Sequence, residues 1–205
     1  MADAEQVLKN VTLAVLAGGA GSRMGGPKGE LIVRGVPILQ YLLERLAWPG
    51  PTLLVTAPGR EHPPASALFD REVTDAVGDE GPFRGVLTAI EHAGTSIIAI
   101  VTVDMPGVTT PQMSWLVQQL PRDSMGVMMK RRIGSDEQVE PFPLVLRASA
   151  RSLLSELLQR GERSVWRLRQ CAGFSVIDAP TDWPEHTWMN LNAPADYNAF
   201  VEDEH

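Results

Sequence analysis

The sequence predicts an α/β fold: a single three-layer, doubly wound, Rossmann-like domain with a mostly parallel sheet. Short β-branched apolar runs alternate along the chain with amphipathic helical segments. No internal repeat, low-complexity segment or interdomain linker interrupts the 205 residues. We therefore expect one domain over residues 1–205, with residues 1–10 flexible.

The first expected strand is Val11–Ala17, a β-branched apolar run that leads into a glycine-rich loop. Residues 18–29 contain six glycines, which suit a loop whose backbone closely approaches a ligand. Arg23 and Lys28 lie in the same loop. Exposed backbone N–H groups together with two cations indicate an anion cradle, most often for phosphate.

Three interpretations of this loop differ in their glycine and lysine spacing. A Walker A loop needs Gly-Lys-Ser/Thr, but Lys28 lies between Pro27 and Gly29. The glycine spacing is one residue too long for a dinucleotide fingerprint, and no acidic residue directly follows the next expected strand. The remaining pattern, L-A-G-G-x-x-x-R-M-G-G followed by Lys, resembles the loop of nucleotidyltransferases that activate small phosphorylated molecules with NTP. A ligand-free turn would need neither cation.

The next elements follow from apolar periodicity and from Pro/Gly punctuation. A helix that Pro37 begins carries apolar residues at 3.6 spacing, and Trp48 to Pro51 ends it. The expected strands around this helix are Glu30–Arg34, Thr52–Thr56 and Glu72–Thr74, with a loop or short helix over Ala57–Leu68.

The middle of the chain contains its most strand-like run, Ser96–Val103, which suits a central parallel strand covered on both faces. The helix before it opens at Gly81, and its N-terminus favours anions. Helices are then expected over Pro111–Leu120, Ser149–Gln159, Arg163–Cys171 and Pro194–Val201. Strands are expected over Ser124–Lys130, Phe142–Leu146, Phe174–Ile177 and Trp188–Leu191, with 131–140 as a polar excursion.

Three candidate site elements lie just past the carboxyl ends of expected strands: the Gly18 loop, Asp75 and Asp104. Ligands of open α/β sheets bind at that edge, so these elements can reach one crevice. Asp104 is too far before Pro111 to cap the next helix, and its carboxylate suits Mg²⁺. Asp75 is expected to contact a base or ribose.

The residues around this crevice indicate direct phosphoryl chemistry, because no nucleophile motif accompanies them. A substrate phosphate would attack the α-phosphorus of an NTP while Arg23 and Lys28 neutralise the triphosphate. Mg²⁺ on Asp104 would bridge phosphates and stabilise the leaving pyrophosphate. We expect these three residues to be the catalytic ones.

Charge and cysteine content exclude several classes of protein. A formal net charge of −7 argues against broad nucleic-acid binding. Cys171 is the only cysteine, so no internal disulfide is expected and a reducing compartment is favoured. The first ten residues are polar and no apolar run approaches 18 residues, so neither a signal peptide nor a membrane span is expected. We expect a cytoplasmic enzyme.

Six motifs in order resemble those of the molybdenum cofactor guanylyltransferases, within the MobA-like NTP transferases and their nucleotide-diphospho-sugar transferase fold. The resemblance covers nearly the whole chain. The motifs are Leu16–Gly19 with Arg23–Gly26 and Lys28; Gly81–Gly85; Val103–Pro106; Glu140-Pro141 with Leu144–Leu146; Gly161–Arg163; and Asn190–Asp196.

The resemblance implies GMP transfer from GTP to the phosphate of molybdopterin, with Mg²⁺ as cofactor and pyrophosphate as the second product. It implies acceptor contacts from Arg163, Asn190 and Asn192, with Mg²⁺ on Asp104. Molybdenum-insertion and cofactor-delivery proteins are implied partners of a monomer or weak homo-oligomer. The nucleotide contacts would come from Leu16, Ala17, Gly18, Gly19, Lys28, Thr56, Asp75, Gly81, Pro82 and Asp104.

Two alternatives stay open at this point. A related enzyme would use CTP or another small phosphorylated acceptor, because Pro27-Lys28 is commoner in the cytidylyltransferases, whereas Gly18-Gly19 favours guanine by resemblance. An idle nucleotide-binding adaptor would have lost the site charges, yet Arg23, Lys28 and Asp104 are present. The basic run 130–132 is expected to be a solvated face, with an acceptor-phosphate site as its alternative.

Overall fold

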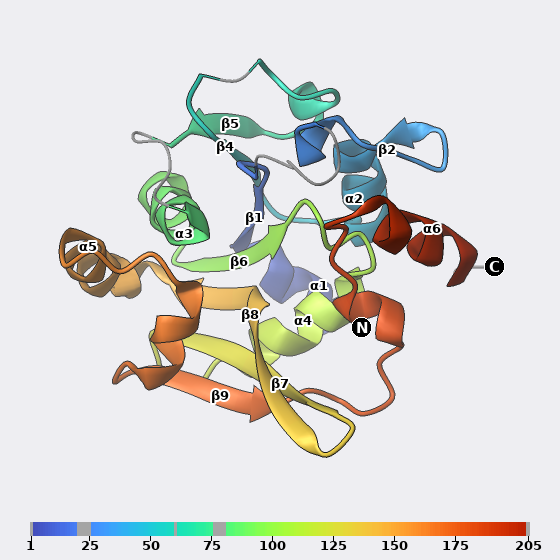
Figure 1. Ribbon diagram of the computed structural model, residues 1–205. Helices are drawn as coiled ribbons and strands as arrows, with labels where there is room; N and C mark the ends of the chain where they lie inside the picture. Colours follow the sequence, from blue (N-terminus) through green and yellow to red (C-terminus); the bar gives the residue numbers. More distant parts are fainter. Residues whose placement is uncertain (1, 20–25, 60, 76–80, 204–205) are drawn as a thin grey trace.

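A computed structural model describes residues 2–19, 26–59, 61–75 and 81–203. Its centre is a seven-stranded sheet (Figure 1). The strand order is β5-β4-β1-β6-β8-β7-β9. From β1 the chain first adds β4 and β5 on one side of the sheet. It then crosses over and adds β6 on the other side of β1, which is the doubly wound pattern that the sequence predicts.

The first half of the sheet is parallel. β1 (Val11–Leu16) lies between β4 (Thr52–Thr56) and β6 (Ile97–Thr102), and β5 (Arg71–Thr74) pairs with the outer side of β4. Every residue of β1 is buried, since helices cover both faces of this part of the sheet. The continuous apolar runs that predicted these strands therefore reflect their burial on both faces.

The second half of the sheet is mixed. β8 (Asp136–Arg147) runs antiparallel to both β6 and β7 (Gly126–Ile133). β9 (Phe174–Asp178) then pairs parallel with β7 at the far edge. The sheet is mostly parallel, as predicted, with the long strand β8 as the antiparallel member.

Helices complete a three-layer arrangement (Figure 1). α3 (Gly81–His92) and α5 (Arg151–Gln159) pack together on one face, and α1 (Ala2–Leu8) and α4 (Thr110–Gln118) pack together on the other. α2 (Ile38–Leu46) joins the α4 side, where the Thr110 hydroxyl donates to the Leu46 carbonyl. This confirms the layered architecture that the sequence predicts.

The last helix, α6 (Pro194–Asp203), lies beside α2 and a small hairpin of β2 (Ile32–Val33) and β3 (Val36–Pro37). The Phe200 ring is fully buried and meets the Tyr41 ring edge-on at 6.2 Å. Short 3-10 turns occupy Lys28–Glu30 (η1), Ser66–Leu68 (η2), Ala148–Ala150 (η3), Val165–Gln170 (η4) and Glu185–Trp188 (η5).

The polar segment 131–140 is not an excursion between two short strands, as expected, but the outer part of one β7–β8 hairpin. Ile133 pairs with Asp136, so only Gly134 and Ser135 form the turn, and Gly134 has a φ of +60°. Cross-strand ion pairs stabilise this polar extension, including Lys130 with Glu137 at 3.0 Å. A two-residue Gly-Ser turn between strands is the signal that could have revealed it.

Two other predicted elements differ in type. The helix expected over Arg163–Cys171 is the shorter 3-10 turn η4, which fits the short space between α5 and β9. The strand expected over Trp188–Leu191 does not form; the chain leaves η5 and the Leu191 N–H donates to the carbonyl of Asp104 at 2.8 Å instead of joining a ladder. This difference places the segment over the end of β6.

The N-terminal stretch forms α1, and Leu8 at its end is buried at 2% exposure. The sequence predicts no element there, and the flexibility of residues 1–10 stays a prediction. Among the helices of the described ranges, none combines the length and the apolar character that crossing a membrane requires.

Candidate active site

The carboxyl ends of the four parallel strands meet at one edge of the sheet. The Ala17 N–H donates to the Val55 carbonyl at 2.8 Å, just past the end of β1. The Asp75 N–H donates to the Thr56 carbonyl at 2.9 Å, so β5 and β4 end side by side. The loops after these strands and after β6 therefore open onto a common edge, which is the position predicted for the site.

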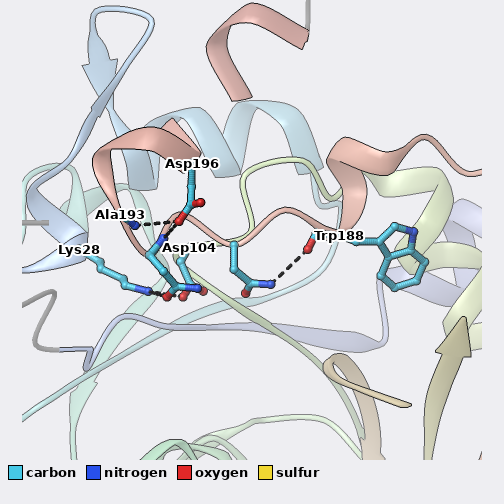
Figure 2. A network of polar contacts seen from close by, with 7 residues as sticks. Lys28, Asp104, Trp188, Ala193 and Asp196 are labelled. Carbon is cyan, nitrogen blue, oxygen red and sulfur yellow. Dashed lines mark hydrogen bonds and ion pairs between the residues drawn. The ribbon is translucent and has the colours of Figure 1, made fainter. Parts of the chain in front are cut away.

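Lys28 joins the loops at this edge into a cluster with Asp104 and Asn192 (Figure 2). Its Nζ donates to Asp104 Oδ2 at 2.5 Å and to Asn192 Oδ1 at 2.6 Å. The Lys28 and Asp104 side chains are only 12% and 16% exposed. Partial removal from water strengthens this ion pair relative to one on an open surface. We call Lys28, Asp104 and Asn192 the lysine cluster.

Residues 190–196, which we call the closing segment, contact the lysine cluster through Leu191 and Asn192. Asp196 Oδ2 accepts the N–H groups of Asn192 at 2.9 Å and Ala193 at 2.8 Å (Figure 2). The Asn190 amide is used differently, because it donates to the Trp188 carbonyl at 3.1 Å. The two asparagines predicted for the acceptor side therefore have distinct contacts, and Asn192 is the one that reaches Lys28.

Asp104 has one oxygen to offer a ligand. Its Oδ1 atom is buried and has no hydrogen-bond partner within the described ranges, whereas its Oδ2 atom pairs with Lys28. A buried carboxylate oxygen without a partner is costly unless a ligand satisfies it. Mg²⁺ prefers such oxygens and is often bound by one or two carboxylates plus phosphates and water. The donor set therefore fits a magnesium ion that substrate and water largely coordinate.

Metal coordination by protein residues alone is not indicated. Within the parts of the chain that the structure describes, no group of three or more His, Cys, Asp and Glu side chains lies close enough to hold an ion. Mg²⁺ on Asp104 accordingly stays a prediction that depends on the nucleotide phosphates as co-ligands.

Of the glycines before Lys28, Gly19 lies close to the cluster. A Cβ added to Gly19 would lie 3.7 Å from Lys28 Cδ, so the backbone at Gly19 approaches the lysine side chain. Gly18 lies beside Ala57, which follows β4. Arg23, the other predicted cation of this loop, lies outside the described residues.

The predicted nucleoside side of the site adjoins α3. A Cβ added to Gly85 would lie 3.4 Å from Leu16 Cδ1 and 3.8 Å from Asp75 Oδ2. Leu16, Asp75 and the first turns of α3 are thus neighbours. Gly81 and Pro82 open that helix, and the helix N-terminus favours anions. Their contact with a nucleotide stays a prediction.

Thr56 is fixed between two strands. Thr56 is buried, with 6% of its surface exposed, and its hydroxyl donates to the Val73 carbonyl at 3.3 Å. It also shares a hydrogen bond with the Thr74 hydroxyl at 3.2 Å. These bonds hold the ends of β4 and β5 together, and the nucleotide contact that the resemblance implies for Thr56 is untested.

Arg163 lies in the segment between α5 and η4 and does not belong to the lysine cluster. Its Nη1 donates to the carbonyls of Leu158 at 2.9 Å and Glu162 at 3.0 Å. Its own carbonyl would lie 3.4 Å from a Cβ at Gly81, the first residue of α3. Arg163 and Asn192, both predicted to contact the acceptor, are therefore held by different elements.

A second cation cluster lies on the β7–β8 hairpin. Arg131 Nε donates to Glu140 at 2.7 Å, and its Nη1 donates to Glu185 at 2.7 Å. The guanidinium also lies over the Trp188 ring, 5.3 Å from its centroid. Burial lowers the pKa of Arg131. The carboxylates of Glu140 and Glu185 raise it by more than burial lowers it, so the pKa is above the ordinary value. We call Arg131, Glu140 and Glu185 the arginine cluster.

The structure corrects the expectation that the basic run 130–132 is a solvated face at Lys130 and Arg131, whereas Arg132 is exposed as expected. The Arg131 side chain is only 17% exposed, and Lys130 pairs with Glu137 at 3.0 Å and Asp178 at 3.4 Å. Burial raises the pKa of the Cys171 thiol, which makes it less reactive than an ordinary thiol and supports a structural role.

Sequence reasoning missed the role of Asp196 and the backbone bond from Leu191 to Asp104. Asp196 is the third residue of α6, where acidic or amide side chains often reach back to bond N–H groups before a helix. That spacing could have predicted the cap. The bond from Leu191 carries no signal in the sequence, because it depends on where the chain passes.

Comparison with known proteins adds a family and a fold. Residues 13–173 match the family described as MobA-like NTP transferase domain. A molybdenum cofactor guanylyltransferase of Serratia proteamaculans (strain 568) is 30% identical over 171 residues, which cover 82% of this chain and 84% of that protein.

Two solved structures have the same fold. Molybdopterin-guanine dinucleotide biosynthesis protein A from Archaeoglobus fulgidus has a TM-score of 0.71 at 22% identity, covering 94% of this chain and 97% of that one. The 2-C-methyl-D-erythritol 4-phosphate cytidylyltransferase from Thermus thermophilus has a TM-score of 0.74 at 16% identity, covering 94% and 98%. The fold is therefore that of the nucleotide-diphospho-sugar transferases, as predicted.

Proposed function

The chain belongs to the MobA-like NTP transferase family, and we propose that it transfers GMP from GTP to the phosphate of molybdopterin, releasing pyrophosphate. Membership makes it a nucleotidyltransferase. The choice of GTP and molybdopterin rests on the guanylyltransferase relative, which is similar over most of both chains.

The lysine cluster is the observation that carries this proposal. It lies at the carboxyl edge of the parallel strands, where such folds bind ligands. It combines a cation that can pair with phosphate with a carboxylate that has one unsatisfied buried oxygen. A buried carboxylate oxygen without a partner is costly in a purely structural ion pair, which favours a ligand at this position.

The reaction needs position and charge more than covalent help from the protein. A phosphate oxygen of the acceptor attacks the α-phosphorus of GTP, a new P–O bond forms, and the bond between the α-phosphorus and the bridging oxygen breaks. The electron pair leaves with pyrophosphate. Lys28 and Arg23 neutralise charge on the triphosphate, and holding both phosphates in line lowers the entropic barrier.

Asp104 would hold Mg²⁺ when the nucleotide is bound. Bound there, the ion would supply charge neutralisation at the phosphate oxygens. The residues of this chain then do the remaining work: Lys28 and the loop before it hold the phosphates, and Leu16 and Asp75 hold the nucleoside against α3. Gly81 and Pro82 would add the N-terminus of that helix.

The two sides of the site would receive different substrates. Four residues belong with the GTP side, because they lie at or just past the carboxyl ends of β1 and β4: Ala17, Gly18, Gly19 and Thr56. Arg163, Asn190 and Asn192 belong with the acceptor side, as the resemblance implies. Support for the division comes from the closing segment, which brings Asn192 to the lysine that would hold the phosphates.

A CTP-dependent reaction is the second candidate. Pro27 directly precedes Lys28, a pairing commoner in the related cytidylyltransferases. The structural likeness to a cytidylyltransferase shows only the fold and therefore does not decide between the nucleotides. An idle adaptor is disfavoured because Lys28 and Asp104 are both present and paired.

We further propose the setting of this enzyme from its sequence. It would act in the cytoplasm as one domain, as a monomer or weak homo-oligomer, with Mg²⁺ as cofactor. Its partners would include molybdenum-insertion and cofactor-delivery proteins, and neither nucleic acid nor membrane. The net charge of −7 supports the exclusion of nucleic acid.

Transfer of label from the nucleotide tests the proposal directly. Purified protein with Mg²⁺ and molybdopterin is incubated separately with α-³²P-labelled GTP and CTP, and the products are separated by chromatography. We expect label to enter a molybdopterin dinucleotide only from GTP, with stoichiometric pyrophosphate. Transfer from CTP alone would support the second candidate, and transfer from neither, in protein that is folded, would contradict both. The Asp104→Asn variant serves as the control for contaminating activity.

A further inference from the structure

The closing segment is fastened to the lysine cluster at two points. Its Leu191 N–H donates to the Asp104 carbonyl at 2.8 Å, and its Asn192 Oδ1 accepts from Lys28 Nζ at 2.6 Å. Lys28 and Asn192 are 164 residues apart in the sequence. Two adjacent residues of this segment therefore contact both partners of the ion pair.

Asp196 determines the shape of the segment (Figure 2). One oxygen, Oδ2, accepts both the Asn192 N–H at 2.9 Å and the Ala193 N–H at 2.8 Å. Both donors precede α6 and have no partner from within the helix, and the Asn192 N–H also donates to the Asn190 carbonyl at 2.9 Å. A carboxylate is also favoured at a helix N-terminus. The bonds fix the backbone of Asn192 and so limit its side chain to the few rotamers that start from this position, one of which reaches Lys28.

The helix that carries Asp196 is itself anchored. The Tyr197 hydroxyl donates to the Ile32 carbonyl at 2.9 Å, in β2, which directly follows the turn of Lys28. The fully buried Phe200 ring fixes the next turn of the helix against Tyr41. The helix thus holds a constant position relative to the lysine and can transmit that position to Asn192.

We propose that Asp196 is a positioning residue that holds the Asn192 carboxamide on Lys28 and so directs the ammonium group toward the phosphates of a bound nucleoside triphosphate. The phosphate part rests on the proposed function, whereas the contact between Asn192 and Lys28 does not. Asp196 acts through Asn192 and touches no substrate. Without it, Lys28 keeps Asp104 as an anchor but loses the neutral partner that fixes its direction.

Amine labelling measures this positioning without a nucleotide. The chain has three lysines, Lys9, Lys28 and Lys130. Brief acetylation followed by peptide mass measurement gives the reactivity of Lys28 relative to the exposed Lys9. In Asp196→Ala we expect this ratio to rise on the order of tenfold, as for the loss of a hydrogen bond to a charged group. Asp196→Asn keeps an acceptor oxygen and is expected to stay near wild type.

Asp70 provides a matched control. Its carboxylate also accepts a backbone N–H, from Thr52 at 2.8 Å, and the Thr52 hydroxyl at 3.0 Å. Asp70 directly precedes β5 and accepts from the first residue of β4. It therefore lies at the amino ends of these parallel strands, whereas the lysine cluster lies at the carboxyl ends. Asp70→Ala should lower the free energy of unfolding about as much as Asp196→Ala does, but should leave the labelling of Lys28 unchanged.

A second variant keeps the test decisive if Asp196→Ala folds poorly. Asn192→Ala removes the contact with Lys28 but keeps the two backbone N–H groups that donate to Asp196. We expect it to raise Lys28 labelling as much as Asp196→Ala does. An unchanged ratio in folded Asp196→Ala, or in Asn192→Ala, would overturn the positioning role.

A double-mutant cycle connects the role to nucleotide binding. Calorimetry gives the affinity for Mg²⁺·GTP of wild type, Lys28→Ala, Asp196→Ala and the double variant. We expect Asp196→Ala to weaken binding on the order of tenfold in the wild-type background and not at all in the Lys28→Ala background. Additive losses would show that Asp196 acts independently of Lys28 and would overturn the inference. If wild type binds no GTP, the proposed function fails, while the labelling ratio still decides the positioning role.

Discussion

The lysine cluster and the arginine cluster both pair one cation with carboxylates, but they differ in how completely their polar atoms are satisfied. In the arginine cluster, Arg131 bonds two carboxylates, and Glu140 also accepts from the Gln138 amide at 3.2 Å. In the lysine cluster, Lys28 has one carboxylate and one amide, and Asp104 keeps a buried oxygen with no partner within the described ranges.

From this difference we infer that the arginine cluster is a structural ion pair and that the lysine cluster is the proposed binding site. A cation with a complete set of partners stabilises the hairpin and gains little from a ligand. A cluster with an unsatisfied buried carboxylate oxygen is more stable once a metal ion supplies the missing partner. Location agrees with this distinction, because the lysine cluster lies at the carboxyl ends of parallel strands and the arginine cluster lies on the antiparallel hairpin.

The largest effect is expected at the carboxylate of the lysine cluster. Asp104→Asn should lower the rate of nucleotidyl transfer on the order of a hundredfold or more, because it removes a main electrostatic group. The melting temperature should stay within a few degrees of wild type, since Asn retains the shape of Asp. A rate equal to wild type in a steady-state pyrophosphate assay would rule out the metal role of Asp104.

Removal of the cation should have the next largest effect. Lys28→Ala should lower the rate on the order of tenfold to a hundredfold, because it removes a cation from the proposed phosphate site. The loss of stability should be modest, because the Asp104 side chain that loses its partner keeps some exposure to water. The same assay, with thermal unfolding alongside, checks both parts. A large drop in melting temperature with intact activity would assign Lys28 to the fold.

Arg131→Met should show the opposite division of effects. It leaves the nearly buried Glu140 with only Gln138 as a neutral partner, so the free energy of unfolding should fall by about 2 kcal/mol. The transfer rate should stay within about twofold of wild type, because the arginine cluster is satisfied without substrate. Urea unfolding and the pyrophosphate assay measure the two quantities. A rate loss like that of Lys28→Ala would instead place Arg131 in the acceptor site.

The smallest effect is expected at Cys171. Burial raises the pKa of its thiol, so a smaller fraction is thiolate at neutral pH and alkylation should be slower than in the unfolded chain. The alkylation rate should increase with pH to above the ordinary thiol pKa. Cys171→Ser should change the free energy of unfolding by no more than about 0.5 kcal/mol and the transfer rate by no more than about twofold. Loss of transfer activity in this variant would contradict a structural role.

The two clusters also show what could be predicted from the sequence. Lys28 and Asp104 are predictable because each follows a strand that a continuous apolar run identifies, and parallel strands bring their carboxyl ends together. The contact of Lys28 with Asn192 is not predictable in this way, because it joins positions 164 residues apart through a segment without regular structure. Only the family resemblance placed Asn192 near the site.

The arginine cluster was missed for a different physical reason. The basic run 130–132 and the acidic residues that follow it resemble a solvated loop when each strand is considered alone. Their stabilisation depends on cross-strand pairs such as Arg131 with Glu140, which exist only once the register of the hairpin is set. The Gly-Ser turn sets that register, so it was the informative part of the segment.

The most direct test of the difference between the clusters is the shift in melting temperature that Mg²⁺·GTP causes in wild type, Arg131→Met and Asp104→Asn. Ligand binding to the folded state raises the melting temperature by mass action. We expect equal shifts in wild type and Arg131→Met and a shift close to zero in Asp104→Asn. Equal shifts in all three proteins would contradict the claim that the lysine cluster is the nucleotide site.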